Sequence, residues 1–217
     1  MNHPQAIYVA FYTVGTRYEQ EIARLRSSLE ALALPYDIQG VADKGTWVAN
    51  TRYTAQFILT MLQKYQNRPV VYLDADAVIW SHPTLFEHLE CDIGVHYRKG
   101  RQLLNGTVFL APTTAAARVI TAYVDLVDSH PSERDEQRML AEAIGLVSDV
   151  RVAQLPPTYC WIHDIMRDDI AGCDAVIEHL QASREAEGHY SHLTENRRKR
   201  LREIETKLHS GISRTQQ

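Results

Sequence analysis

The stretch VVYLDADAVIW, Val70 to Trp80, places two aspartates one residue apart inside an otherwise apolar run. A carboxylate in such a setting costs free energy unless it is paired, hydrogen-bonded or bound to a cation. The residues before the pair are apolar, mostly β-branched or aromatic, and follow Pro69, which is typical of a buried strand. What Asp74 and Asp76 bind at the end of that strand therefore bears on both fold and function.

Two strand-and-helix units precede the aspartates. Residues Ala6 to Thr13 predict a first strand, and an amphipathic helix follows over residues 16–34. Residues 36–41 predict a second strand, and Thr51 to Tyr65 a second helix capped by Asn50 or Thr51. The order β-α-β-α-β predicts a parallel sheet with helices on its faces, so we expect an α/β fold with a mostly parallel central sheet.

The pattern continues beyond the aspartates, with a short helix predicted over residues 82–89. We predict further strands at residues 91–97, 103–112 (entered through the turn pair Asn-Gly), 149–156, 157–162 and 175–181. Two more helices are expected, over residues 113–130 with a threonine cap and over residues 132–145 ended by Gly145. From Leu193 the chain becomes charged and helical, so we divide it into a domain over residues 1–190 and a helical tail over residues 191–217.

The composition is that of an ordinary globular protein. The 217 residues are 45% hydrophobic and carry a formal net charge of −4, which gives no basic field toward nucleic acid or an anionic membrane. The cysteines Cys91, Cys160 and Cys173 lack zinc-ligand spacing and predict free thiols in a reducing compartment. No signal peptide and no apolar run of about 20 residues is evident, so we expect a soluble, cytoplasmic protein.

The spacing of Asp74 and Asp76 points to a metal ion. Residues two apart in an extended chain point the same way, and ligands in α/β sheets bind beyond the carboxyl ends of strands. A shared divalent cation would remove the repulsion between the carboxylates, and oxygen ligands suit Mg²⁺ or Mn²⁺. Such an ion usually completes its shell with water and substrate phosphates, which favours a phosphorylated substrate.

With these elements in this order, the chain resembles the nucleotide-diphospho-sugar glycosyltransferases of the GT-A fold. YLDADAVIWSHPTLFE is similar to the DxD metal-binding segment of that family, and AIYVAFYTVGT, WVANTRYTAQFILTML, NGTVFLAPT and ERDEQRML resemble its other motifs in order. The resemblance covers about Ala6 to Leu180. It implies sugar transfer from a nucleoside diphosphate sugar, with UDP the favoured nucleotide, to an acceptor hydroxyl, with Mn²⁺ or Mg²⁺ as cofactor. The sugar and the stereochemistry stay open, as does the acceptor: a glycan, a protein or a modified DNA base.

The resemblance also implies metal and donor ligands. Asp76 would bind the metal directly, and Asp74 the metal or the ribose. His179, in EHLQASR, would be a further metal ligand, although the glycine and lysine usual in that loop are missing. Where the family has a lysine this chain has Thr54, and Arg52 nearby would supply positive charge for the diphosphate.

The remaining implied contacts concern the nucleoside and the sugars. The base and ribose would lie beside Phe11, Tyr12 and Thr13. The donor sugar would lie near Asn105 and Gly106. Hydroxyls of the sugar or the acceptor would be bound by Asp135 and Gln137. Asp135 would be the general base if the enzyme inverts. Each also has a structural interpretation, such as strand packing, a turn pair, or an acid at a helix start.

Two other functions stay open at this stage. A haloacid-dehalogenase-type phosphatase would use Asp74 as its nucleophile and Asp168 and Asp169 as its late acidic pair, but DADAV lacks the threonine of that family's DxDxT motif. A non-catalytic nucleotide-sugar-binding module is the other. The basic run NRRKRLRE, residues 196–203, predicts either a solvated charged helix or a contact with an anionic acceptor.

Overall fold

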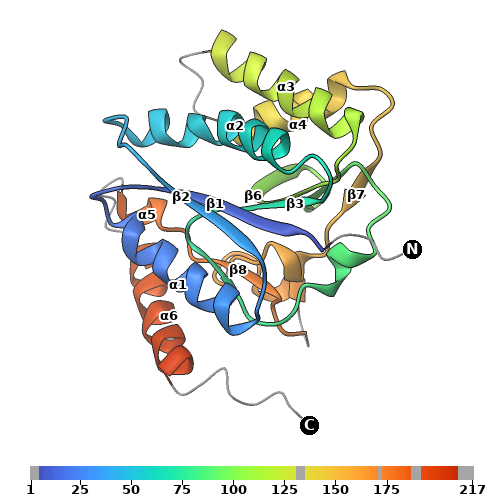
Figure 1. Ribbon diagram of the computed structural model, residues 1–217. Helices are drawn as coiled ribbons and strands as arrows, with labels where there is room; N and C mark the ends of the chain where they lie inside the picture. Colours follow the sequence, from blue (N-terminus) through green and yellow to red (C-terminus); the bar gives the residue numbers. More distant parts are fainter. Residues whose placement is uncertain (1–4, 131–134, 171–172, 187–191, 210–217) are drawn as a thin grey trace.

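The computed structural model describes residues 5–130, 135–170, 173–186 and 192–209. Six strands form a central sheet in the order β2-β1-β3-β6-β5-β7, and two short strands form a second sheet (Figure 1). The strands of the central sheet are β1 (Ile7–Thr13), β2 (Tyr36–Val41), β3 (Val70–Leu73), β5 (Ile93–Arg98), β6 (Gln102–Leu110) and β7 (Val152–Gln154). The second sheet pairs β4 (Ala77–Ile79) with β8 (Ile177–His179).

Helices cover both faces of the central sheet (Figure 1). The α-helices are α1 (Tyr18–Ala31), α2 (Trp47–Lys64), α3 (Thr114–Ser129), α4 (Glu136–Leu146), α5 (Ser183–Ala186) and α6 (His192–His209). Short 3₁₀ helices are η1 (Thr84–Glu87), η2 (Pro157–Tyr159) and η3 (Arg167–Ile170). Side chains of α2, α3 and α4 share one hydrophobic core with the sheet, and those of α1 share a second core on the opposite face.

The predicted α/β fold with a mostly parallel sheet is confirmed. Strand β1 pairs in parallel with both β2 and β3, as the β-α-β-α-β order requires, and β7 is parallel to β5. Strand β6 runs antiparallel to β3 and β5. The carboxyl ends of β1 and β3 therefore meet at one edge of the sheet.

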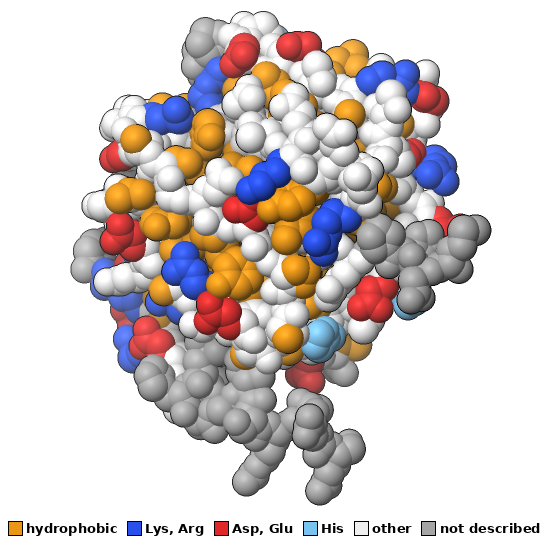
Figure 2. Space-filling view, viewed as in Figure 1, with side chains coloured by type: hydrophobic (Ala, Val, Ile, Leu, Met, Phe, Trp, Pro, Cys, Tyr) orange, Lys and Arg blue, Asp and Glu red, His pale blue; other side chains and the backbone are white. Residues whose placement is uncertain are grey.

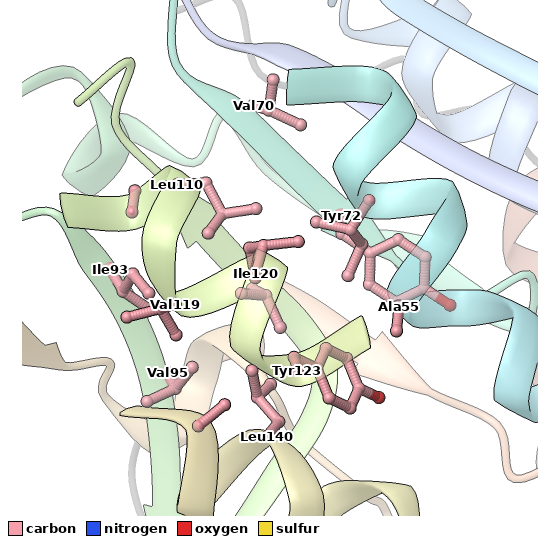
Figure 3. Packing of buried hydrophobic residues seen from close by; sticks show 14 of the residues in the cluster. Ala55, Val70, Tyr72, Ile93, Val95, Leu110, Val119, Ile120, Tyr123 and Leu140 are labelled. Carbon is pink, nitrogen blue, oxygen red and sulfur yellow. The ribbon is translucent and has the colours of Figure 1, made fainter. Parts of the chain in front are cut away.

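The core between the sheet and helices α2 to α4 fixes the position of β3. Figure 3 shows Tyr123 and Ile120 of α3 lying between β3 and α4, near Tyr72 and Leu140. Tyr123 and Leu140 are fully buried. Burial of one large apolar side chain contributes about 1.5–3 kcal/mol to the stability of the folded state, so this packing stabilises the position of β3.

Two local predictions near the site are wrong. Asn105 and Gly106 lie inside β6 and form no turn; the turn that precedes this strand is at Lys99 and Gly100, both with positive φ. Helix α2 begins at Trp47, because the Thr46 side chain accepts a hydrogen bond from the Ala49 amide at 3.1 Å.

Two further predictions fail in the second half. Gly145 does not end α4, which continues to Leu146. Residues 157–162 contain the helix η2 and an isolated bridge at Trp161 where we predicted a strand. Of the predicted helix over residues 132–145, residues 132–134 lie outside the described part of the chain.

Helix α6 packs on the domain beside α1 (Figure 1). Ile204 is fully buried against Val78 and Leu180. Arg197 is also buried, and its guanidinium contacts Glu21 of α1. The described part of the predicted tail thus shares a core with the domain, and two arginines of its basic run, Arg197 and Arg200, are paired with buried carboxylates.

On the face shown in Figure 2, basic and acidic side chains alternate over the described surface without a large patch of one sign. Across the described residues, no helix combines the length and apolar character that a membrane span requires. The three cysteines are free thiols, with Cys91 and Cys160 buried.

Candidate functional site

The chain turns sharply at Asp74 to Asp76, where β3 leaves the central sheet. The Asp74 amide donates to the Gly106 carbonyl at 2.9 Å, and the Ala77 amide donates to the Asp74 carbonyl at 3.0 Å. After this turn the chain enters β4 of the second sheet. Both carboxylates therefore lie at the carboxyl end of β3, the edge where α/β sheets bind ligands.

Strand β8 brings His179 to the same point. It pairs antiparallel with β4, so that His179 lies opposite Ala77. Asp74, Asp76 and His179 each offer one ligand atom, and these atoms all lie within 4.8 Å of one another. The structure thus brings together the three residues that we predicted as metal ligands.

Two of the three side chains have one atom held by the protein and another without a partner. Asp76 Oδ2 accepts a hydrogen bond from the Ala182 amide at 2.7 Å, and His179 Nε2 lies 2.8 Å from the Thr107 hydroxyl. Asp76 Oδ1 and His179 Nδ1 are buried, have no hydrogen-bond partner and lie 3.7 Å apart. A buried polar atom without a partner costs free energy, and a shared cation would satisfy both atoms.

Gly106 keeps the space between the ligands open. A Cβ at this position would lie 2.9 Å from His179 Cε1, too close without a shift, and 3.2 Å from Asp74 Oδ2, a tight contact. We predicted that Gly106 would approach the donor sugar; the structure places it against the ligand cluster. Two carboxylates, an imidazole and a backbone without a side chain fit a divalent cation.

The pKa values reflect like charges in a buried place. Burial and the charge of Asp76 raise the pKa of Asp74 to about 6, although His179 and the Tyr72 hydroxyl, 2.8 Å away, act in the other direction. Burial also opposes ionisation of Asp76, but contacts with His179 and the Ala182 amide hold its pKa below the usual 3.8. The pair is therefore costly to ionise fully without positive charge beside it, and although burial opposes this, Asp76 in turn helps to raise the pKa of His179.

An open pocket lies beside the cluster, and Asp74 and Asp76 form part of its wall. It is lined by the end of β1, the first half of α2, the start of α4 and the segment after β8. Of the predicted site residues, Phe11, Tyr12, Thr13, Asp74, Asp76, Asn105, Asp135 and Gln137 line it.

Arg52 takes a different position. Its guanidinium donates to the carbonyls of Val127 and His130 at the end of α3, and it is not among the residues that line the pocket. Thr54, where the resembling family has a lysine, does line it. The role of Arg52 at a diphosphate stays a prediction that this placement does not favour.

Asp168 and Asp169, the acidic pair of the phosphatase alternative, are exposed in η3. They do not belong to the cluster of Asp74, Asp76 and His179. The arrangement of the described residues therefore favours a metal site at the DxD turn over a phosphatase site.

Solved structures of glycosyltransferases share this fold, although no protein-family model and no curated protein sequence matches the chain. A glycosyltransferase involved in glycosylation of the major capsid of PBCV-1 superposes with a TM-score of 0.66 over 84% of this chain and 97% of its own, at 13% identity. GlyE of Streptococcus pneumoniae TIGR4 gives a TM-score of 0.56 over 81% of this chain, at 16% identity, and the match spans 54% of GlyE. An active-site mutant of LgtC gives 0.50 over 80% of this chain and 86% of its own, at 10% identity. The chain has the GT-A glycosyltransferase fold.

In this GT-A domain, two side chains near the pocket were not predicted. Thr107 is fully buried and orients the His179 ring. Glu136 lines the pocket, and its buried Oε2 has no hydrogen-bond partner. Burial, together with the charges of Asp74 and Asp135, raises the pKa of Glu136 to about 8. Its position between two predicted residues at a helix start was the only sequence signal for Glu136.

Asp135 combines two interpretations that the sequence left open. Its side chain accepts a hydrogen bond from the Arg138 amide at 3.0 Å, which makes it the N-cap of α4. The same residue is solvent-exposed and lines the pocket. Capping thus fixes this carboxylate at the mouth of the GT-A pocket.

Proposed function

We propose that this protein is a glycosyltransferase that moves a sugar from a nucleoside diphosphate sugar to an acceptor hydroxyl. Mn²⁺ or Mg²⁺ would be held by Asp74, Asp76 and His179. The observation that carries the proposal is this trio at the edge of an open pocket, with Asp76 Oδ1 and His179 Nδ1 buried and without a hydrogen-bond partner. The fold shared with known glycosyltransferases supports it.

A bound cation would act as a Lewis acid and stabilise the departing nucleoside diphosphate. The chain itself supplies the donor contacts. Phe11, Tyr12 and Thr13 at the end of β1 would hold the base and ribose, for which we favour uridine. Asn105 and Gln137, with unpartnered Nδ2 and Oε1 atoms, would bind sugar hydroxyls.

Asp135 and Glu136 differ in whether their side chains can accept a proton at neutral pH. Burial and the charges of Asp74 and Asp135 raise the pKa of Glu136 to about 8, so its carboxyl group is mostly protonated at neutral pH and cannot act as a base there. The exposed Asp135 is therefore our candidate for the base that accepts the proton of the attacking hydroxyl, if the reaction inverts the anomeric centre.

The free thiols support a reducing compartment, and we propose the cytoplasm.

A thermal-shift panel tests the proposal and names the donor. Nucleoside diphosphates and nucleotide sugars are added with Mn²⁺ or with chelator. A ligand at about 100 times its Kd stabilises the native state by about 2.7 kcal/mol, which for a domain of this size is about 5–10 °C. We expect this shift with UDP and Mn²⁺ together, and its loss in Asp76→Asn but not in the control Asp168→Asn.

Release of UDP from the identified donor in the presence of acceptor or water then tests turnover. Binding without any turnover would favour the non-catalytic module. Phosphate release from generic phosphoesters, abolished in Asp74→Asn, would favour the phosphatase. Full metal-dependent transfer by Asp76→Asn would end the proposal.

A further inference from the structure

Arg197 of α6 is one of the most completely buried charged residues described, with 4% of its surface exposed. Each nitrogen of its guanidinium has a partner. Nε donates to the Leu180 carbonyl at 2.7 Å, Nη1 to Glu185 at 2.8 Å and Nη2 to Glu21 at 2.6 Å. A planar guanidinium spreads its N–H donors over three nitrogens, whereas the three donors of a lysine ammonium share one nitrogen and do not reproduce this fork.

The Leu180 carbonyl belongs to the segment that completes the metal cluster. Leu180 directly follows His179, and its amide donates to the Asp76 carbonyl at 3.1 Å. Two residues later, the Ala182 amide donates to Asp76 Oδ2 at 2.7 Å. Residues 180–182 are therefore bonded to the DxD turn on one side and to Arg197 on the other.

This short segment also stores backbone strain. Gln181, between the two amides that bind Asp76, has a φ of 53°, in the left-handed region that non-glycine residues rarely adopt. Such a conformation costs about 1–3 kcal/mol and persists only where neighbouring contacts fix it. The bond from Arg197 to the Leu180 carbonyl is such a contact, because it lies one residue before the strained position.

The other two partners of Arg197 connect it to the rest of the fold. Glu21 belongs to α1, and Glu185 belongs to α5 and also accepts from Arg17 at 2.6 Å. The guanidinium is thus held by two carboxylates from different helices while Nε faces the Leu180 carbonyl. Figure 1 shows α6 running beside α1, with α5 near the end of both.

We propose that Arg197 is a positioning residue of the metal centre: it fixes residues 180–182, which in turn hold Asp76 and His179 in ligating geometry. The inference rests on the metal site of the proposed function. Partners that orient metal ligands are typically worth 10–100-fold in metal affinity. A substitution that weakens the hydrogen bonds of Arg197 should therefore lower the affinity for the metal without removing any metal ligand.

Arg200 provides a matched control in the same helix. It donates to Glu178 through Nε and Nη2, both at 2.8 Å, and Glu178 is fully buried. Glu178 precedes His179 in β8, so the two side chains point to opposite faces. Glu178 accepts a hydrogen bond from Trp80 as well, and the hydrogen bonds of Arg200 go to Glu178 and Glu203, not to residues 180–182. Its replacement perturbs a buried ion pair of α6 while leaving Leu180 in place.

The experiment measures Mn²⁺ binding to the full chain without substrate, from the electron paramagnetic resonance signal of free Mn²⁺. We expect Arg197→Lys to raise the Kd for Mn²⁺ at least about 10-fold, and Arg200→Lys to change it less than about twofold. Circular dichroism and thermal unfolding of both variants report the fold separately from the affinity.

Each outcome decides one question. If the wild type does not bind Mn²⁺, the proposed metal centre fails and the inference with it. If the wild type binds and the two variants bind equally well, the role of Arg197 is overturned while the proposed function stands. Should Arg197→Lys not fold, Glu185→Gln removes one of the two carboxylates that hold the guanidinium; several-fold weaker Mn²⁺ binding supports the inference, and wild-type affinity overturns it.

Discussion

A single methyl group added at position 106 should obstruct the proposed metal site. In Gly106→Ala the new Cβ would lie 2.9 Å from His179 Cε1, 3.0 Å from His179 Nδ1 and 3.2 Å from Asp74 Oδ2. The imidazole cannot move away freely, because Nε2 is bonded to the buried Thr107 hydroxyl. Forcing an extra carbon into a packed place costs about 1–3 kcal/mol.

In the metal-free variant the His179 ring can turn away only by giving up its bond to the Thr107 hydroxyl, and it must turn back to bind the ion. The same 1–3 kcal/mol then appears as a loss of Mn²⁺ affinity of about 5- to 150-fold. Calorimetric titration of Mn²⁺ into wild type and variant measures this ratio directly.

Gly145→Ala is the control. It lies within α4, and apart from its chain neighbours and the backbone of that helix nothing lies within 4 Å of its added Cβ, so the variant should keep wild-type affinity and gain up to about 0.5–1 kcal/mol of stability. An affinity of Gly106→Ala within twofold of wild type would refute the placement of the ion between Asp74 and His179.

Three further outcomes follow from described contacts. Thr107→Val removes the hydroxyl bonded to His179 and should weaken Mn²⁺ binding about 10-fold by the same titration; unchanged affinity would argue against ring orientation by Thr107. Because burial and nearby acids raise the pKa of Glu136 from 4.5 to about 8, its contribution to stability is complete below pH 4.5 and is lost as the pH rises toward 8. Metal-free Glu136→Gln should therefore gain stability over the wild type between pH 5 and pH 8 in urea titrations, whereas parallel pH profiles would contradict this. Ile204→Ala should cost about 2–5 kcal/mol in urea unfolding, since the side chain is fully buried against Val78, and a cost below about 0.5 kcal/mol would show that α6 does not pack as described.

The first half of the fold was predictable from local pattern. Strand β3 is buried on both faces and therefore reads as a continuous apolar run, and helices of clear period separate the strands before it. Parallel pairing then follows from connection length and handedness, without knowledge of partners. The end of β3, and with it the site of Asp74 and Asp76, was fixed by the same reasoning.

Elements that depend on distant partners were harder to predict. Asn105 and Gly106 favour a turn locally, but pairing with β3 and β5 carries the strand through them. Conversely, Gly145 stays in a helix because the packing of α4 outweighs its weak propensity. In both places tertiary contacts outweigh a local sequence preference.

In the candidate site too, the residues that depend on distant partners were harder to predict than those that follow from local pattern. His179 was proposed only through a resemblance, because its approach to Asp76 depends on β4 pairing with β8. Thr107 and Glu136 carried no motif; their roles come from what lies opposite them in the folded chain. For Arg197, a basic run indicated charge on a helix surface, while the structure buries this member of the run.

The order of the ligands along the chain has a consequence for biosynthesis. Asp76 and the Ala182 amide that holds it are 106 positions apart. At about 5–20 residues per second, the ribosome makes the second roughly 5–20 s after the first. During that interval the nascent chain carries an acidic pair that no imidazole, amide or arginine completes. Capture of the proposed cation would thus await the last strand and helix, and an interrupted polypeptide would lack the complete trio even with its DxD turn intact.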